Sequence, residues 1–173
     1  MIELRDAQFS DFGAIAKLHS QSWQQNYRGI LSDHFLDDEV EKAHADMWKK
    51  RLESPGKGQQ VTIATLDEKL VGFSCLLLDE DTVFGSLLDN LHVLTNGQNT
   101  GIGRLLMQNC AGTIRERCDQ DKMYLWVYEL NKNARKFYER LDGTSFETIE
   151  KENIDGTKAQ VCRYIWDNVS LII

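Results

Sequence analysis

The sequence lacks the features that mark zinc-binding, exported or membrane-spanning chains. Its four cysteines, at positions 75, 110, 118 and 162, form no Cys-x-x-Cys or Cys-x-x-His pair that could begin a zinc site. No apolar run approaches the ~20 residues of a membrane span, and residues 1–6 lack the apolar stretch of a signal peptide. We therefore expect a cytoplasmic chain with reduced, mostly packed thiols, no metal and no membrane partner.

Proline is also scarce, and basic residues are fewer than acidic ones. The chain has one proline, 42% hydrophobic residues and a formal net charge of -7. These values predict a compact single domain over residues 1–173 and argue against a nucleic-acid-binding surface. The acidity mildly favours a cationic partner such as an amine, although solubility alone also explains it. The oligomeric state is left open, with a homodimer as one outcome.

The hydrophobic periodicity predicts alternating strands and helices. Strand-like segments cover residues 2–5, 61–66, 70–78, 87–93, 124–128, 146–153 and 159–166. Helices are expected from Ser10 or Asp11, over 32–52, over 102–117, and after Asn131. The order β-α-α-β-β-β-α-β-α-β-β predicts an α/β fold with a mixed central sheet flanked by helices. The strand, helix and strand over 87–128 imply a crossover between parallel neighbours.

A glycine turn between the strand at 87–93 and the next helix carries the most information. Backbone N–H groups at a helix start have no partner within the helix, so the turn Gln98-Asn-Thr-Gly101-Ile-Gly103 can hold a diphosphate. A dinucleotide-binding fingerprint is excluded because Leu106 stands where a third glycine is needed. A P-loop is excluded because Arg104 follows Gly103 in place of Lys. A lone Gly-x-Gly is also typical of an ordinary turn that packs closely.

A second motif follows the strand at 124–128. It reads Asn131-x-x-Ala134-x-x-Phe137-Tyr138, which places the apolar residues on one helix face. Taken by itself, the motif is explained by a helix N-cap at Asn131 and a core tyrosine at Tyr138.

Together, the two motifs resemble motifs A and B of the GNAT superfamily, the Gcn5-related N-acetyltransferases, and the resemblance extends over nearly the whole chain. Thr95 stands where a proline is common, Asn99 where a glycine is common, and the second helix ends differently from the usual Gly-Phe. The resemblance implies a GNAT-like fold whose strands splay beside the glycine turn to admit acetyl-CoA. The implied cofactor-binding residues are Leu91, His92, Val93, Gln98, Asn99, Thr100, Gly101, Ile102, Gly103, Arg104, Asn131 and Tyr138.

The resemblance also implies catalytic roles. Tyr138 is expected to give a proton to the departing thiolate, and a backbone N–H of residues 91–93 to stabilise the oxyanion. Many relatives carry a glutamate base where this chain has Leu87. Asp89 is the nearest carboxylate and would share the face of Leu87 if strand pairing is regular. A water chain, or Asp89 as a merely solvated residue, explains the sequence equally well; His92 and Glu129 also lie close to the expected cleft.

The residues that would bind the acetyl acceptor are less well defined. Trp23 and Tyr27 fall where the fold places its acceptor-binding wall, but their i, i+4 spacing also fits simple core packing. His19, His34 and His44 have no catalytic partner in the sequence and are interpreted as structural or surface residues.

The leading hypothesis is an acetyl-CoA-dependent N-acetyltransferase that acts on the primary amine of a small molecule by direct transfer in a ternary complex. Two alternatives stay open: a protein or peptide N-acetyltransferase, and a catalytically silent CoA-binding sensor module.

Overall fold

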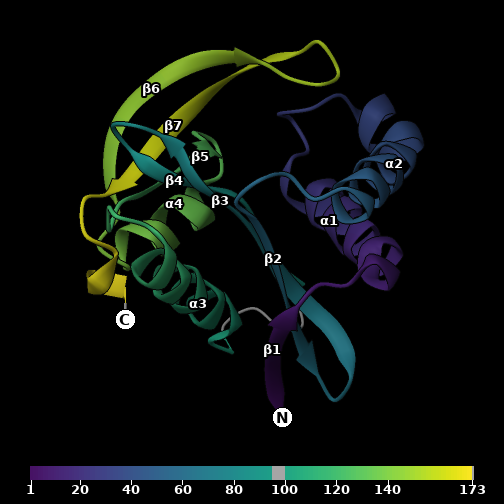
Figure 1. The fold of residues 1–173 in the computed structure, drawn as a ribbon. Helices are drawn as coiled ribbons and strands as arrows, with labels where there is room; N and C mark the ends of the chain where they lie inside the picture. Colours follow the sequence, from purple (N-terminus) through teal and green to yellow (C-terminus); the bar gives the residue numbers. More distant parts are fainter. Residues whose placement is uncertain (95–99, 173) are drawn as a thin grey trace.

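A computed structural model describes residues 1–94 and 100–172, which fold around one seven-stranded sheet (Figure 1). The strand order across the sheet is β1-β2-β3-β4-β5-β7-β6. The strands are β1 (Ile2–Asp6), β2 (Gln59–Leu66), β3 (Lys69–Asp81), β4 (Gly85–Val93), β5 (Met123–Tyr128), β6 (Thr144–Glu152) and β7 (Lys158–Trp166).

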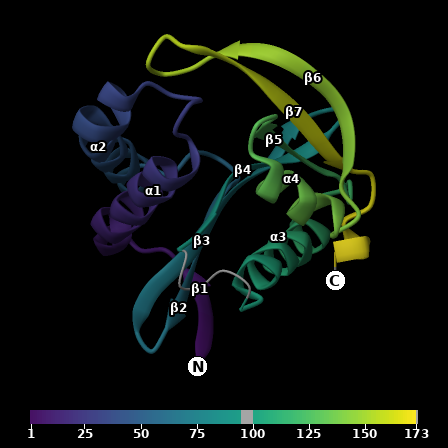
Figure 2. The ribbon, with the colours of Figure 1, turned by 180° about the vertical axis from the view of Figure 1, so that it is seen from behind.

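Two helices cover each face of the sheet. The helices α1 (Phe12–Asn26) and α2 (Val40–Glu53) lie against one face, while α3 (Ile102–Arg117) and α4 (Lys132–Glu139) lie against the other (Figures 1 and 2). The predicted mixed α/β order is therefore confirmed. None of the helices in the described part of the chain combines the length and apolar content needed to cross a membrane.

Most predicted boundaries agree with the structure within a few residues, and the α3 bounds coincide with the prediction. The expected helix over 32–52 is interrupted, because Phe35–Glu39 forms a π-helical turn before α2 begins at Val40. A tight turn joins β2 to β3, with Asp67 and Glu68 at positive φ of 50° and 66°. Such paired positive angles suit the twist of a short hairpin connection.

The pairing between β4 and β5 is parallel, as the crossover predicts, but it is short. It joins Ser86 to Met123 and Leu87 to Tyr124. Within the described residues, β4 and β5 share no further pairs. From Leu88 onward the facing edges of β4 and β5 are not joined to each other. The sheet is therefore split beside the start of α3, which is the splay that the family resemblance implied.

The strand β4 contains a bulge at Asp89. Cys75 of β3 pairs with Asn90, whereas the next β3 residue, Leu76, pairs with Leu88, so Asp89 has no partner in the β3–β4 register. A bulge bends a strand and redirects the side chains that follow. The regular pairing assumed for Asp89 and Leu87 is therefore wrong at this point.

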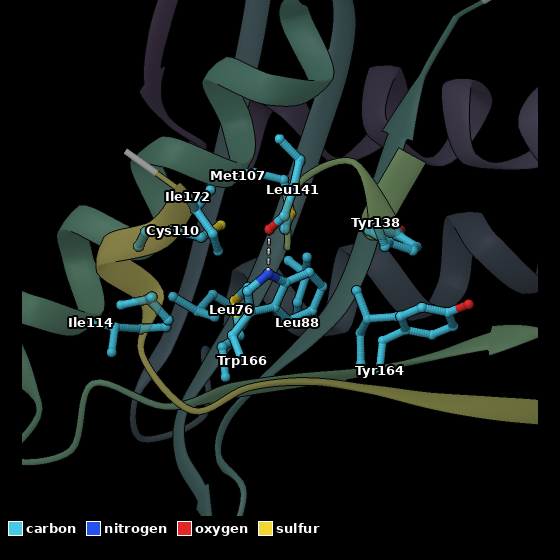
Figure 3. Packing of buried hydrophobic residues seen from close by; sticks show 14 of the residues in the cluster. Leu76, Leu88, Met107, Cys110, Ile114, Tyr138, Leu141, Tyr164, Trp166 and Ile172 are labelled. Atoms are coloured by element: carbon cyan, nitrogen blue, oxygen red, sulfur yellow. Dashed lines mark hydrogen bonds between the residues drawn. The ribbon is translucent and has the colours of Figure 1, made fainter. Parts of the chain in front are cut away.

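The apolar core lies on both faces of the sheet. The larger cluster packs α3 and α4 on β4, β5 and β7, and Figure 3 shows Trp166 in it, with its indole N–H donating to the Leu141 carbonyl at 2.7 Å. A second cluster packs α1 and α2 on β2 and β3. Of the four cysteines, Cys75, Cys110 and Cys162 are buried and Cys118 is half-buried, all as free thiols. The packing expected for most of them is confirmed.

Candidate active site

The glycine turn ends at Gly101, which is the N-cap of α3. Gly101 has φ of 87° and ψ of -4°, a left-handed conformation that residues with a Cβ rarely adopt. Its carbonyl oxygen accepts the first hydrogen bond of the helix, which the N–H of Leu105 donates at 3.0 Å. The N–H groups of the first α3 turn, at residues 102–104, have no acceptor within an α-helix and carry the positive end of its dipole. The predicted residues Gln98 and Asn99 lie outside the described residues.

Gly103 has a packing role. A Cβ at this position would lie 3.2 Å from Cζ of Phe137, tighter than ordinary side-chain contact. Glycine therefore lets the first turn of α3 approach α4 closely. By contrast, no atom of the described residues outside the neighbouring peptides lies within 4 Å of a Cβ placed on Gly101. The two glycines thus act differently, one through conformation and one through close approach.

Asn131 joins the end of β5 to α4 as a helix N-cap. Its Oδ1 accepts a hydrogen bond from the N–H of Ala134 at 3.2 Å. The cap interpretation of this residue is confirmed. Since Oδ1 is engaged, the two N–H donors of the carboxamide are the groups that Asn131 offers to another molecule.

Tyr138 lies in the last turn of α4, in the larger core cluster (Figure 3). Its side chain packs against Phe137 and Trp166, and only 8% of the residue is exposed. Burial raises the pKa of the Tyr138 hydroxyl above its ordinary value, so the group is protonated at neutral pH.

Tyr27 follows α1, on the opposite face of the sheet from Tyr138. Burial raises its pKa, and the charge that Tyr138 would carry raises it further, so the two hydroxyls lie within electrostatic range. The ring of Tyr27 also meets Tyr128, at the end of β5, edge-on at a centroid distance of 4.8 Å. Tyr27 therefore lies against the end of β5, on the far side of the sheet from α4.

Trp23 lies one turn earlier on α1 and packs mainly between helices. Its ring is 5.3 Å from Tyr27, 6.4 Å from Phe35 and 4.6 Å from His44, between centroids. Tyr27 therefore packs against Tyr128 at the end of β5, while the ring of Trp23 packs against Tyr27.

Asp89 is held by a residue that the sequence analysis did not identify. Arg51, at the end of α2, donates to Asp89 Oδ2 at 2.7 Å and to Asn90 Oδ1 at 3.1 Å. Both charged side chains are a little under one-third exposed. The pair lies on the α1–α2 side of the sheet, at the bulge. No spacing rule connects residues 51 and 89, because the contact depends on how α2 crosses the strand.

The side chains at the end of β4 alternate between the two faces. Leu91 and Val93 pack toward Ile102 and Leu106 of α3. His92 points the other way and lies 2.9 Å from Ser22 Oγ through its Nδ1. Burial lowers the pKa of His92 to about 3, so its imidazole is neutral at physiological pH.

A groove of about 300 Å³ opens beside Tyr128. It is bordered by the α1–α2 connection, the end of β5 and the start of β7. Its lining residues are Gly29, Ile30, Tyr128, Glu129, Leu130, Lys158, Ala159 and Gln160. Glu129 therefore lines a groove at the end of β5 and brings a carboxylate to it.

Comparisons with known proteins agree with this geometry. The acetyltransferase (GNAT) family matches residues 16–143. The uncharacterized N-acetyltransferase YuaI of Bacillus subtilis is 25% identical over 178 residues, which cover 99% of this chain and 96% of YuaI. The probable N-acetyltransferase Rv2775 of Mycobacterium tuberculosis is 29% identical over 155 residues, covering 84% of this chain and 83% of that protein.

Solved structures share the fold. PaiA N-acetyltransferase from Thermoplasma acidophilum, in complex with coenzyme A, superposes with a TM-score of 0.72 at 16% identity, covering 94% of this chain and 98% of PaiA. YncA, a putative acetyltransferase from Salmonella typhimurium with its cofactor acetyl-CoA, gives 0.69 at 14% identity, covering 96% of this chain and 93% of YncA. From the family match over residues 16–143, together with the split sheet and the glycine turn, the chain belongs to the GNAT family of acetyltransferases.

Proposed function

We propose that the protein is an acetyl-CoA-dependent N-acetyltransferase that acts on the primary amine of a small molecule by direct transfer in a ternary complex. The observation that carries this proposal is the split between β4 and β5. Val93, at its open end, packs against Ile102 at the start of α3. Tyr138 and Tyr27 come from opposite faces of the sheet and lie within electrostatic range of each other.

The residues at the split fit acetyl-CoA. The first turn of α3 offers N–H donors to a diphosphate. The unpaired edge of β4 offers backbone groups to the amides of the pantetheine arm, and Asn131 offers its carboxamide N–H groups. The proposed set is Leu91, His92, Val93, Gln98, Asn99, Thr100, Gly101, Ile102, Gly103, Arg104, Asn131 and Tyr138.

Acetyl-CoA supplies the acetyl group as an activated thioester. In the proposed mechanism Tyr138 donates its hydroxyl proton to the departing thiolate, and its raised pKa keeps that proton in place until the transfer. A backbone N–H of residues 91–93 stabilises the negative charge that develops on the carbonyl oxygen. Asp89, held by Arg51, accepts the proton of the amine, directly or through water.

Transfer without a covalent enzyme intermediate is supported by the state of the thiols. Burial raises the pKa of Cys75 to about 12 and of Cys110 to about 11, which leaves very little thiolate to attack an acetyl donor. Cys162 is buried in the larger core cluster. Cys118 follows the last residue of α3, at the opposite end of that helix from the glycine turn.

A small amine fits the groove beside Tyr128. Its volume of about 300 Å³ lies at the lower end of the range found for small-molecule sites. Glu129 supplies a carboxylate that attracts an ammonium group, while Tyr128 supplies an aromatic wall. The net charge of -7 favours encounter with cations.

The test is a thiol-release assay with acetyl-CoA and a panel of amino acids, polyamines, aminoglycosides and short peptides. We expect sustained release of CoA with at least one small amine and a product heavier by one acetyl group. Tight CoA binding without turnover on any amine would identify a sensor module instead. Turnover on peptides alone would identify a peptide acetyltransferase, and absence of CoA binding would refute the proposal.

A further inference from the structure

Half of the sheet is open on the side that carries α1 and α2. Those helices pack on β2 and β3, and none of the described helices lies over the same side of β5, β7 and β6, which we call the open side (Figures 1 and 2). Trp126 of β5 and Arg163 of β7 are directly opposite each other in the strand register. Their strand neighbours Val127 and Cys162 lie in the core beneath α3 and α4. Since side chains alternate along a strand, Trp126 and Arg163 point to the open side.

Three aromatic rings hold the guanidinium of Arg163 in place. Its Cζ lies 4.1 Å from the ring centre of Phe84, 4.5 Å from that of Trp126 and 5.6 Å from that of Tyr124. The Arg163 side chain is 17% exposed. An arginine that is stacked in this way loses little further freedom when its N–H groups bind a partner. Arg163 is therefore pre-organised to bind through the edge of its guanidinium.

The binding capacity of Arg163 is only partly used. A guanidinium has five N–H donors and binds a carboxylate best through two of its nitrogens at once. Here the ion pair joins Nη2 to Glu147 Oε1 at 2.8 Å, and the described residues bring no second carboxylate within ion-pair distance. Within the same residues Nε is buried without a hydrogen-bond partner, whereas Nη1 is not among the buried atoms that lack one. The Nη1 edge of Arg163 is therefore left for a second anion.

Arg163 and the proposed base lie on opposite sides of the split. The pairing of β4 with β5 ends at Tyr124, and Trp126 is the next β5 residue on the open side. Asp89 lies toward the same side, at the bulge of β4. Burial raises the pKa of the Tyr124 hydroxyl, carboxylates that include Asp89 raise it further, and the charge of Arg163 opposes them. The negative charge of Asp89 and the positive charge of Arg163 therefore both act on the place where the split begins.

We propose that Arg163 is a specificity-determining residue that binds a carboxylate of the acceptor, so that amino acids are the preferred substrates. An amino acid brings an ammonium group to Asp89 and a carboxylate to Arg163 at the same time. A simple amine leaves the Arg163 donors unpaired, which forfeits a charge-assisted interaction. A polyamine also places positive charge near Arg163 and near Lys151, whose Nζ lies 4.2 Å from the ring centre of Trp126. This inference rests on the function proposed above.

The experiment compares kcat/KM for the best amino acid of the panel with kcat/KM for its carboxamide, which has nearly the same shape and no negative charge. Arg163→Gln removes the positive charge, and Arg163→Lys keeps the charge without the planar set of donors. Arg115→Gln is the matched control, because Arg115 is an exposed arginine of α3, on the other face of the sheet. Thermal unfolding of each variant checks that it folds.

We expect the wild type to prefer the amino acid at least tenfold over its carboxamide. Arg163→Gln should bring the two substrates within threefold of each other, mainly by raising KM for the amino acid. Arg163→Lys should reduce the preference at least threefold. In each variant KM for acetyl-CoA should not change, and Arg115→Gln should match the wild type.

Three results would overturn the inference while leaving the proposed function in place. The first is a wild type that acetylates the carboxamide as well as the amino acid. The second is a wild type that acetylates amines without a carboxylate but no amino acid. The third is an unchanged preference in folded Arg163→Gln or, if that variant does not fold, in Arg163→Lys. A wild type that acetylates no amine would refute the proposed function itself, and this inference with it.

Discussion

The imidazole ring of His19 stacks on that of His44, with centroids 3.7 Å apart and planes within 3° of parallel. His92 completes a cluster of three histidines, since its centroid lies 4.5 Å from that of His19. Trp48 donates its indole N–H to His19 Nδ1 at 3.1 Å, so this nitrogen must be unprotonated and His19 neutral. His34 is separate from the cluster: it is exposed and pairs with the nearby Asp38.

The cluster predicts loss of stability in mild acid. Burial lowers the pKa of His44 to about 4 and of His92 to about 3, and lowers that of His19 well below 6.5. The unfolded chain binds protons near pH 6.5, where the folded chain does not. Stability is therefore complete above pH 6.5 and falls as the pH drops toward 4, by about 1.4 kcal/mol per pH unit for each histidine. Urea unfolding followed by tryptophan fluorescence between pH 7.5 and pH 4.5 measures this slope.

Substitution identifies the source of the slope. His44→Phe keeps a ring to stack on His19 and removes one titrating group, so it should flatten the dependence of unfolding free energy on pH. His34→Phe makes the same chemical change at an exposed histidine outside the cluster and serves as the control. Equal slopes in all three proteins would show that the cluster does not cause the acid sensitivity.

Tyr138→Phe should lower kcat about a hundredfold, the usual size of a general-acid contribution, with little change in KM for acetyl-CoA. The ring is retained, so its packing against Phe137 and Trp166 is preserved. Tyr164→Phe is the matched control. The Tyr164 hydroxyl lies in the same core, where it donates a hydrogen bond to Glu139 and accepts one from Arg135. It should cost about 1 kcal/mol of stability and leave kcat unchanged. Full activity in Tyr138→Phe would exclude an essential acid at this position.

Gly101→Ala should affect both stability and cofactor binding. At φ of 87° a Cβ is strained, which costs about 1 kcal/mol or slightly more, and relief of that strain would reshape the turn. We expect KM for acetyl-CoA to rise several-fold. Gly112→Ala, in the interior of the same helix and with open space around it, should instead stabilise the protein by up to about 1 kcal/mol. Thermal unfolding with and without CoA separates the effect on stability from the effect on CoA binding. If CoA raised the unfolding temperature of both variants equally, this account of Gly101 would be contradicted.

The sequence predicted the bounds of α3 closely because several local signals agree there. A glycine precedes the helix, apolar residues then recur at helical spacing, and a basic pair ends it. The helix over 32–52 shows the limit of this reasoning. Its periodicity continues through the π-helical turn at Phe35–Glu39, and an extra residue in one turn leaves no distinct mark in composition.

Long-range contacts were not predictable from local patterns. The bulge at Asp89 depends on the register of β3, and the pairing of Asp89 with Arg51 depends on the crossing of α2 over the sheet. The hydrogen bond from the Ser32 N–H to Asp155 joins two segments that no periodicity connects. The sequence motifs thus predicted which elements form the split, whereas the contacts that surround its acceptor side required the tertiary structure.

Asp89→Asn tests whether this carboxylate takes the proton of the amine. If it does, kcat should fall at least tenfold and the acid limb of the pH profile of kcat should move or disappear, with KM for acetyl-CoA unchanged. Arg51 acts only by positioning Asp89 in this account, so Arg51→Gln should lower kcat less, and the double variant should match Asp89→Asn. Asp46→Asn breaks the ion pair with Lys42 on the exposed face of α2 and should leave kcat as in the wild type. An unchanged kcat in Asp89→Asn would assign the proton transfer to water, and the Arg51 contact would then serve only to hold α2 against the bulge.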